Sequence, residues 1–243
     1  MAVKCVFAAI DERGELTGGK AGDQNSKEVM IAPYYQFGQN IVLRPKTKAL
    51  ANKMVSAGKW LANSDLVGYD MSNRTGLYKA VQKVGFKDYR KLKDKCETDC
   101  SAFIAVLVNI AGFDVPADMW TGNMKNELLK TEKFELLTDT KYLISDEFLK
   151  KGDIVLNEDS HVVLVCEDGE AADGSKSYEP VYFTVIPVNG LNLRANPTTK
   201  APIEKILKKG TVVVLKKREG AWYKIECNGR IGYVLAKFLA EKK

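Results

Sequence analysis

Residues 96–112, with the sequence CETDCSAFIAVLVNIAG, constrain the fold of this chain more than any other stretch. The second half of this run is almost continuously apolar, whereas a helix at a protein surface carries one apolar stripe and a polar face. The sequence therefore predicts a buried helix over residues 99–111. Thr98 or Asp99 can cap its N-terminus, and Gly112 stands where a glycine commonly ends a helix.

Cys100 falls in the first turn of this predicted helix. The unpaired backbone N–H groups and the positive end of the helix dipole favour a thiolate there. The single histidine of the chain, His161, comes directly before a predicted buried strand, Val162–Val165. A thiol at a helix start and an imidazole at a strand start are the usual parts of a cysteine hydrolase, a nucleophile and its base.

The residues around both side chains resemble a known family. Asp99-Cys100-Ser101-Ala102-Phe103 resembles the Asp-Cys-Ser-Gly/Ala-hydrophobic signature of the NlpC/P60 cysteine peptidases and of related phage lysins. The run Gly152-Asp153-Ile154-Val155, followed after a short loop by His161-Val162, resembles the histidine segment of that family. The resemblance implies an α+β papain-like catalytic domain that cleaves peptide bonds of bacterial peptidoglycan without a cofactor.

Two further segments are similar to phage lysins. Residues 18–29, GGKAGDQNSKEV, resemble a segment of a group of clostridial lysins in which Thr and Gly replace Asn25 and Ser26. Tyr69 and Asp70 fit the same resemblance, which implies a tyrosine that lines the site; packing in the core is the alternative for Tyr69. The predicted substrate-binding residues are Tyr69, Asp70, Asp99 and Ser101.

A third group is expected to orient the imidazole. The resemblance implies a polar residue on the strand after the histidine strand, but that region of this chain runs into a polar segment instead. The candidates are Glu167, or Asp23 and Gln24 from the glycine-rich N-terminal loop, and the loop is favoured. The predicted catalytic set is therefore Cys100, His161, Asp23 and Gln24.

Cys96, Cys100, His161 and Cys166 could instead hold a zinc ion. Two observations oppose this: no tight Cys-x-x-Cys pair is present, and side chains an odd number apart on a strand, such as 161 and 166, point to opposite faces. We therefore predict no metal. A buried structural role is the other alternative for Cys100, and Cys96 is expected to be packing or peripheral.

The chain outside these motifs predicts a few more elements. Residues 3–10 read as a strand, and apolar residues at helical spacing predict a helix over residues 47–61. Residues 121–124 read as loop before a short helix over residues 127–130, and residues 134–137 read as a strand.

From residue 181 onward, short strands alternate with turns, which predicts a small all-β barrel. The expected strands are Phe183–Val188, Leu191–Arg194, Val212–Lys216, Trp222–Glu226 and Ile231–Val234. Residues 191–197, 207–215, 220–225 and 232–239 resemble a bacterial SH3 (SH3b) domain, and this resemblance implies binding to peptidoglycan. Trp222 and Tyr233 are expected in the core rather than at a ligand, because so small a barrel needs large side chains inside.

The expected domains are a catalytic domain over 1–168, a linker over 169–180 and an SH3b domain over 181–243. From residue 181, ten Lys and three Arg against four Glu give a net charge of +9, so the preceding residues carry −3. A basic domain suits a polyanionic surface, either a cell wall or a nucleic acid. The aromatic and basic residues do not interleave as in nucleic-acid-binding proteins, so no nucleic acid partner is expected.

An odd number of cysteines, five, argues against a disulfide framework. The apolar runs are too short to span a membrane, and residues 1–10 are too short and too soon followed by charge for a signal peptide. We therefore expect a protein that is made in the cytoplasm and reaches the wall after release.

Together these patterns predict a phage-type endolysin that hydrolyses peptidoglycan by a Cys-His mechanism. The γ-D-glutamyl–diamino acid bond is the favoured target, and the N-acetylmuramoyl-L-alanine bond is the alternative on the same fold. A wall-binding protein without catalytic activity is the alternative of another class.

Overall fold

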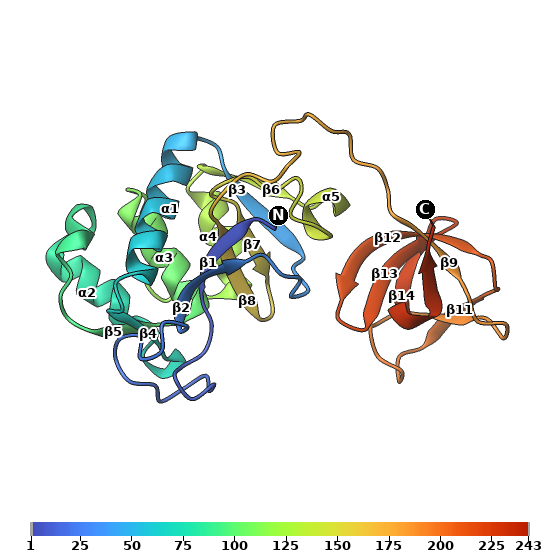
Figure 1. The fold of residues 1–243 in the computed structure, drawn as a ribbon, viewed down its shortest axis with the longest axis horizontal. Coiled ribbons are helices and arrows are strands. Elements are labelled where there is room, and N and C mark those ends of the chain that lie inside the picture. Colours follow the sequence, from blue (N-terminus) through green and yellow to red (C-terminus); the bar gives the residue numbers. More distant parts are fainter. Residues whose placement is uncertain (1, 243) are drawn as a thin grey trace.

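Figure 1 shows the computed structural model, which describes residues 2–242. A larger domain of helices and strands, blue to yellow, is joined by a connecting segment to a small domain made of strands, orange to red. The fold class expected from the sequence, an α+β domain followed by a small all-β domain, is confirmed.

The larger domain is built on a six-stranded antiparallel sheet. In spatial order its strands are β2 (Val29–Pro33), β1 (Lys4–Ala8), β8 (His161–Val165), β7 (Ile154–Asn157), β3 (Ile41–Pro45) and β6 (Phe134–Leu137). A separate parallel pair consists of β4 (Val67–Tyr69) and β5 (Cys96–Thr98), and β5 directly precedes the helix that carries Cys100. The histidine strand β8 therefore lies at the centre of the sheet, with β1 and β7 on either side.

Five α-helices and two short 3₁₀ turns complete this domain in the described residues. They are α1 (Lys48–Ala62), η1 (Met71–Asn73), α2 (Gly76–Val84), η2 (Phe86–Lys91), α3 (Cys100–Ile110), α4 (Thr121–Lys130) and α5 (Thr140–Leu143). Helix α4 begins six residues before the helix expected over 127–130, so the loop prediction for its first turn was wrong. The turn closes because the Oδ1 atom of Asn123 accepts the backbone N–H of Trp120 at 2.8 Å.

Helix α3 is the centre of the core, as its sequence predicts. All eleven of its residues are buried. It packs on the face of the sheet formed by side chains such as Val6 of β1 and Leu164 of β8, and α1 packs beside it. A Cβ on Gly58 of α1 would lie 2.8 Å from Val6 and 3.2 Å from Leu107, so only glycine allows this close approach. Each large aliphatic side chain buried here contributes about 1.5–3 kcal/mol.

The opposite face of the sheet is also covered. Phe7, Val155, Val163 and Val165 form a second apolar cluster there, against which Tyr34 and Phe37 pack. A strand buried on both faces needs apolar residues at consecutive positions, which explains the unbroken apolar run of β8. Within residues 2–242 no helix is both long and apolar enough to span a membrane.

The small domain is one seven-stranded antiparallel sheet. In spatial order its strands are β11 (Ile203–Leu207), β10 (Leu191–Arg194), β14 (Arg230–Leu235), β13 (Trp222–Cys227), β12 (Val212–Glu219), β9 (Tyr182–Val185) and β15 (Leu239–Glu241), with η3 (Ala236–Phe238) before the last. Its core is mainly aliphatic, with Leu193, Leu215 and Ile225 fully buried. Trp222 and Tyr233 are only half-buried, so their expected place in the core was wrong.

The two domains touch through α5. Ile144, directly after α5, is 5% exposed and belongs to the apolar core of the small domain, and its carbonyl accepts the Nη1–H of Arg218 from β12 at 3.1 Å. Tyr178, in the connecting segment, packs on the same core and lies edge-on to Phe148 at 6.0 Å between ring centroids. The first residues of the segment expected as a linker pack on the larger domain, where Ala171 and Ala172 are buried.

A buried ion pair secures the turn before β7. The guanidinium of Arg44 on β3 holds both carboxylate oxygens of Asp153, at 2.8 and 2.7 Å. Asp153 is fully buried, and burial raises its pKa even though Arg44 opposes the shift. Removing the cation alone leaves a buried carboxylate without its partner, which is strongly destabilising.

We expect Arg44→Ala to lower the free energy of unfolding by about 3–5 kcal/mol. Urea denaturation followed by circular dichroism measures this loss. Lys46→Ala, at an exposed position two residues further along the chain, is the matched control and should change it by no more than about 0.5 kcal/mol. A loss below about 1 kcal/mol in Arg44→Ala would show that Asp153 finds another partner or is protonated in the native state.

Candidate active site

The start of helix α3 is held in place by Asp99. Its Oδ1 atom accepts the backbone N–H of Ala102 at 2.7 Å and the hydroxyl of Ser101 at 3.0 Å. Of the two N-cap candidates in the sequence, Asp99 is the one that caps, which satisfies a helix N–H that has no partner within the helix. Ser101 is 3% exposed, so both residues build the helix start and do not face solvent.

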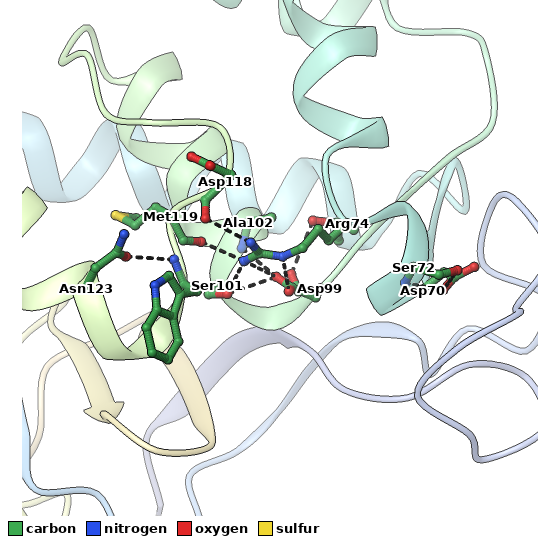
Figure 2. Close-up of polar contacts among 11 residues, drawn as sticks. Asp70, Ser72, Arg74, Asp99, Ser101, Ala102, Asp118, Met119 and Asn123 are labelled. Carbon is green, nitrogen blue, oxygen red and sulfur yellow. Dashed lines mark hydrogen bonds and ion pairs between the residues drawn. The ribbon is translucent and has the colours of Figure 1, made fainter.

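Arg74 contacts the start of α3, and the sequence motifs did not assign it a place there. Figure 2 shows its guanidinium between Asp99 and the segment before α4. Its Nε donates to Asp99 at 2.5 Å, and its Nη2 donates to the Ser101 hydroxyl at 2.8 Å. The same side chain donates to the carbonyls of Asp118 and Met119 at 2.8 and 2.7 Å. Arg74 thus connects the capped helix start to the segment before α4.

Cys100 is 7% exposed at this helix start. Burial raises the pKa of its thiol to about 12, and the Asp99 carboxylate adds to the shift. The backbone N–H groups of Val162 and Ser101 oppose it. Burial of the thiol thus opposes the thiolate that the helix start favours, because the loss of solvation acts against the dipole.

His161 is the first residue of β8 and is enclosed by aromatic rings. The ring centroids of Phe7 and Phe37 lie 5.7 and 5.2 Å from that of the imidazole, both edge-on, and that of Tyr35 lies 6.4 Å away. The Nε2 atom is buried and has no hydrogen-bond partner in the described chain. Burial lowers the pKa of His161 to about 4, so the imidazole is neutral at neutral pH.

Cys100 meets the backbone of the histidine strand at the start of that strand. The sulfur of Cys100 lies against the backbone N–H of Val162, the residue that follows His161. Alternation along β8 turns Val162 towards α3 and His161 towards Phe7. His161 is the first residue of the strand, so it directly precedes the residue whose backbone N–H contacts the Cys100 sulfur.

Two tyrosines lie near the cysteine. Burial raises the pKa of the Tyr69 hydroxyl, with Cys100 as the next contribution, and burial also raises that of Tyr35, where Cys100 contributes as well. Tyr69 is 3% exposed on β4, whereas Tyr35 is 42% exposed. Tyr69 is therefore part of the core and also near the thiol, while Tyr35 presents an open aromatic face beside His161.

The structure does not bring the favoured third residues to the imidazole. The Asp23 carboxylate accepts backbone N–H groups of its own loop, including those of Glu28 at 3.0 Å and Val29 at 3.2 Å. The Gln24 side chain donates to the carbonyls of Ala21 and Gly22, at 3.1 and 2.7 Å. Both side chains organise the loop, because a glycine-rich segment needs such bonds to hold one conformation.

Glu167, the other candidate, accepts the backbone N–H of Lys4 at 2.9 Å and so lies at the far end of β8. Asp70, expected at the substrate, caps η1 by accepting the N–H and hydroxyl of Ser72 at 2.7 and 2.6 Å. Burial opposes ionisation of Asp70, but these hydrogen bonds hold its pKa below the usual value. Neither Glu167 nor Asp70 contacts His161.

Glu28 is a second residue that the sequence motifs missed. It is fully buried, and its carboxylate accepts the backbone N–H of Gln24 at 2.8 Å and that of Tyr69 at 2.9 Å. Burial raises the pKa of the Glu28 carboxyl, although these two hydrogen bonds act to lower it. This carboxylate ties the glycine-rich loop to β4, and so fixes the backbone of Tyr69 near the thiol.

The predicted alternation on β8 separates the proposed zinc ligands. Cys166 joins the apolar cluster on the helix face, whereas His161 lies with the rings on the other face. Among the described residues, no group of three His, Cys, Asp or Glu side chains is placed to hold a metal ion.

Comparisons with known proteins match both parts of the chain. Residues 6–172 match the family model of the endolysin-like domain, and this match covers more than half of the chain. The chain belongs to the endolysin-like domain family. Residues 189–240 match the bacterial SH3 domain, so the small all-β domain is an SH3b domain. Together the two matches support a cell-wall hydrolase.

Other comparisons add little to the family assignment. No curated protein matches the chain. A similar solved structure is that of NlpC2 from Trichomonas vaginalis, with 17% sequence identity and a TM-score of 0.28 over 39% of this chain. The endolysin-like chain covers 33% of the length of that protein, and so limited a likeness carries no conclusion.

The protonation states predict how the thiol reacts in the absence of substrate. A thiol with a pKa of about 12 is almost wholly protonated at pH 8, so iodoacetamide should modify Cys100 far more slowly than a free cysteine, whose pKa is about 8.5. The rate should keep rising through pH 10. Mass spectrometry of digested protein assigns the modified residue, with Cys100→Ser as control. A rate that is already constant from pH 5 to 7 would contradict this and indicate a thiolate–imidazolium pair.

Proposed function

We propose that the protein hydrolyses bacterial peptidoglycan with Cys100 as nucleophile and His161 as general base. The observation that carries this proposal is the position of the Cys100 sulfur, at a capped helix start and against the backbone of the residue that follows the single histidine. The family match and the SH3b domain support the cell wall as the substrate.

The reaction starts from a neutral thiol and a neutral imidazole. The substrate carbonyl enters the site, and the neutral imidazole of His161 takes the thiol proton. The thiolate attacks the carbonyl carbon, and backbone N–H groups at the start of α3 stabilise the oxyanion. The protonated imidazole then gives its proton to the leaving amine, and water releases the acyl group from the sulfur.

Proton transfer follows substrate binding in this mechanism. A carbonyl in the site develops negative charge that stabilises the new imidazolium, and the substrate replaces solvent around the pair. The low pKa of His161 then makes its protonated form a strong acid towards the leaving amine. The same burial that keeps the resting thiol neutral therefore assists the second half of the reaction.

The imidazole is positioned by ring contacts instead of a carboxylate. Phe7 and Phe37 lie edge-on against it, and its buried Nε2 atom has no hydrogen-bond partner within residues 2–242. Edge-to-face packing fixes the plane of a ring without adding charge. We therefore assign the reaction to a Cys–His pair held by aromatic side chains, with no acidic third member.

The bond cut is the γ-D-glutamyl–diamino acid bond, and the N-acetylmuramoyl-L-alanine bond is the alternative. Both reactions break an amide and use the same nucleophile and base, so the residues of the pair favour neither. The SH3b domain binds the wall polymer, and its excess of positive charge suits that polyanionic surface.

Two variants test the proposal. Cys100→Ser should clear purified walls more than about a thousand-fold more slowly than the unchanged protein. The reason is that an alcohol beside a neutral imidazole is a far weaker nucleophile than a thiol. Cys96→Ser is the matched control: Cys96 is also buried and lies only four residues away, but it belongs to β5, and the variant should keep most of the activity. Mass spectrometry of the fragments identifies the bond.

The outcomes separate the classes of function. Clearing of walls by Cys100→Ser at the original rate would refute the nucleophile. Failure of the unchanged protein to release fragments, while it still sediments with walls, would favour a wall-binding protein without activity. A new amino group on the diamino acid supports the endopeptidase, and a new amino group on L-alanine supports the amidase.

A further inference from the structure

A groove of about 940 Å³ runs between the two domains. The endolysin-like domain lines it with Phe37, Asn157 and Thr140, among others. The SH3b domain lines it with strands β12, β13 and β14, which contribute residues such as Lys217 and Tyr233. Neither domain alone forms this groove.

The groove begins beside the catalytic histidine. The ring of Phe37, which lines the groove, lies edge-on to His161 with the ring centroids 5.2 Å apart. Asn157, another lining residue, is the direct partner of His161 in the register of β7 and β8. A polymer chain with one bond at His161 would therefore continue into the groove.

The wall formed by the SH3b domain is fixed in position by packing. Ile144 from the endolysin-like domain is buried in the SH3b core, and Arg218 donates to its carbonyl. Arg218 lies on β12, the strand that carries Lys216 and Lys217 to the groove. The contact thus sets the distance of the lysines from the endolysin-like domain.

Three lysines line the groove, and one of them, Lys224, has no carboxylate partner within residues 2–242. Lys216 pairs with Glu226 at 3.2 Å and Lys217 with Glu219 at 2.8 Å. Lys224 makes no ion pair within residues 2–242; its ammonium instead lies 5.7 Å from the centroid of the Tyr233 ring.

The sheet register adds a second observation. Lys224 lies directly opposite Lys217 on β12 and opposite Tyr233 on β14, so the three side chains form a row on one face. Like charges at directly opposed positions repel each other. An anion in the groove would relieve this repulsion, since only Lys217 has a carboxylate of its own.

We propose that the groove binds an anionic group of the wall polymer through Lys224, so that the SH3b domain forms one side of the substrate site. The anion is a carboxylate of the stem peptide or a phosphate of a wall teichoic acid, and the two share the charge that Lys224 recognises. This proposal rests on the proposed function, because it assumes that the bond to be cleaved lies at Cys100 while the rest of the polymer lies in the groove.

A soluble substrate distinguishes this role from simple anchoring. A disaccharide-peptide is too small to be held at one place and cut at another, so a lysine of the SH3b domain can affect its hydrolysis only through a shared site. We expect Lys224→Ala to raise the KM for this substrate roughly ten-fold, as expected for the loss of one charge-assisted hydrogen bond, with kcat little changed. Lys224→Arg should restore most of the loss.

Lys205→Ala is the matched control. Lys205 is an exposed lysine of the same domain on β11, and it does not line the groove. Removing it changes the net charge by the same amount, so KM should stay at the original value. Circular dichroism of each variant checks that the SH3b sheet is intact.

Two further arms identify the anion. If Lys224 binds a peptide carboxylate, amidation of the free carboxylates of the disaccharide-peptide should raise its KM with the unchanged protein to the value expected for Lys224→Ala. If a phosphate binds instead, Lys224→Ala should act normally on the soluble substrate and lose activity only on walls that retain teichoic acid.

Equal activity of Lys224→Ala and Lys205→Ala on the soluble substrate, on intact walls and on walls stripped of teichoic acid would overturn the groove proposal. The proposed function would survive that result, provided that Cys100→Ser is inactive on the same substrates. Activity in Cys100→Ser would instead refute the proposed function itself, so the two failures are distinguishable.

Discussion

The site depends on one interaction, the hold of Asp99 and Arg74 on the first turn of α3. The N-terminus of this helix lies in the interior, where an N–H without a partner would cost about 1–3 kcal/mol. The Asp99 carboxylate accepts the backbone N–H of Ala102. Arg74 neutralises this carboxylate and ties it to the loop before α4. These bonds fix the direction in which Cys100 leaves the helix, and its sulfur reaches the backbone of β8.

Burial then decides the chemistry of the pair. A solvated cysteine at a helix start would favour the thiolate, but Cys100 is buried, and burial raises the pKa of its thiol to about 12. His161 is neutral for the same reason, since the rings around it exclude water. A neutral resting pair suits the proposed hydrolysis of an insoluble polymer, because in that mechanism the nucleophile forms only when a carbonyl occupies the site.

The sequence predicts the local part of this arrangement and misses the long-range part. The apolar run of α3, its cap and the strand after His161 follow from neighbours in the chain, so they could be read correctly. Arg74 lies 25 positions from Asp99, and no pattern links them. Asp23 and Gln24 appear in a functional-looking motif but bind their own loop. The state of the thiol depends on burial, which a single sequence does not give.

The most direct test of the account is whether the Cys100 thiol and the His161 imidazole lie within bonding reach of each other. The bifunctional reagent 1,3-dichloroacetone joins a thiol to a nearby ring nitrogen through a three-carbon bridge, and the chain has a single histidine to find. Mass spectrometry of the digested adduct should show the peptide with residue 100 linked to the peptide with residue 161. A reagent attached to Cys100 alone, with its second arm hydrolysed, would contradict the account.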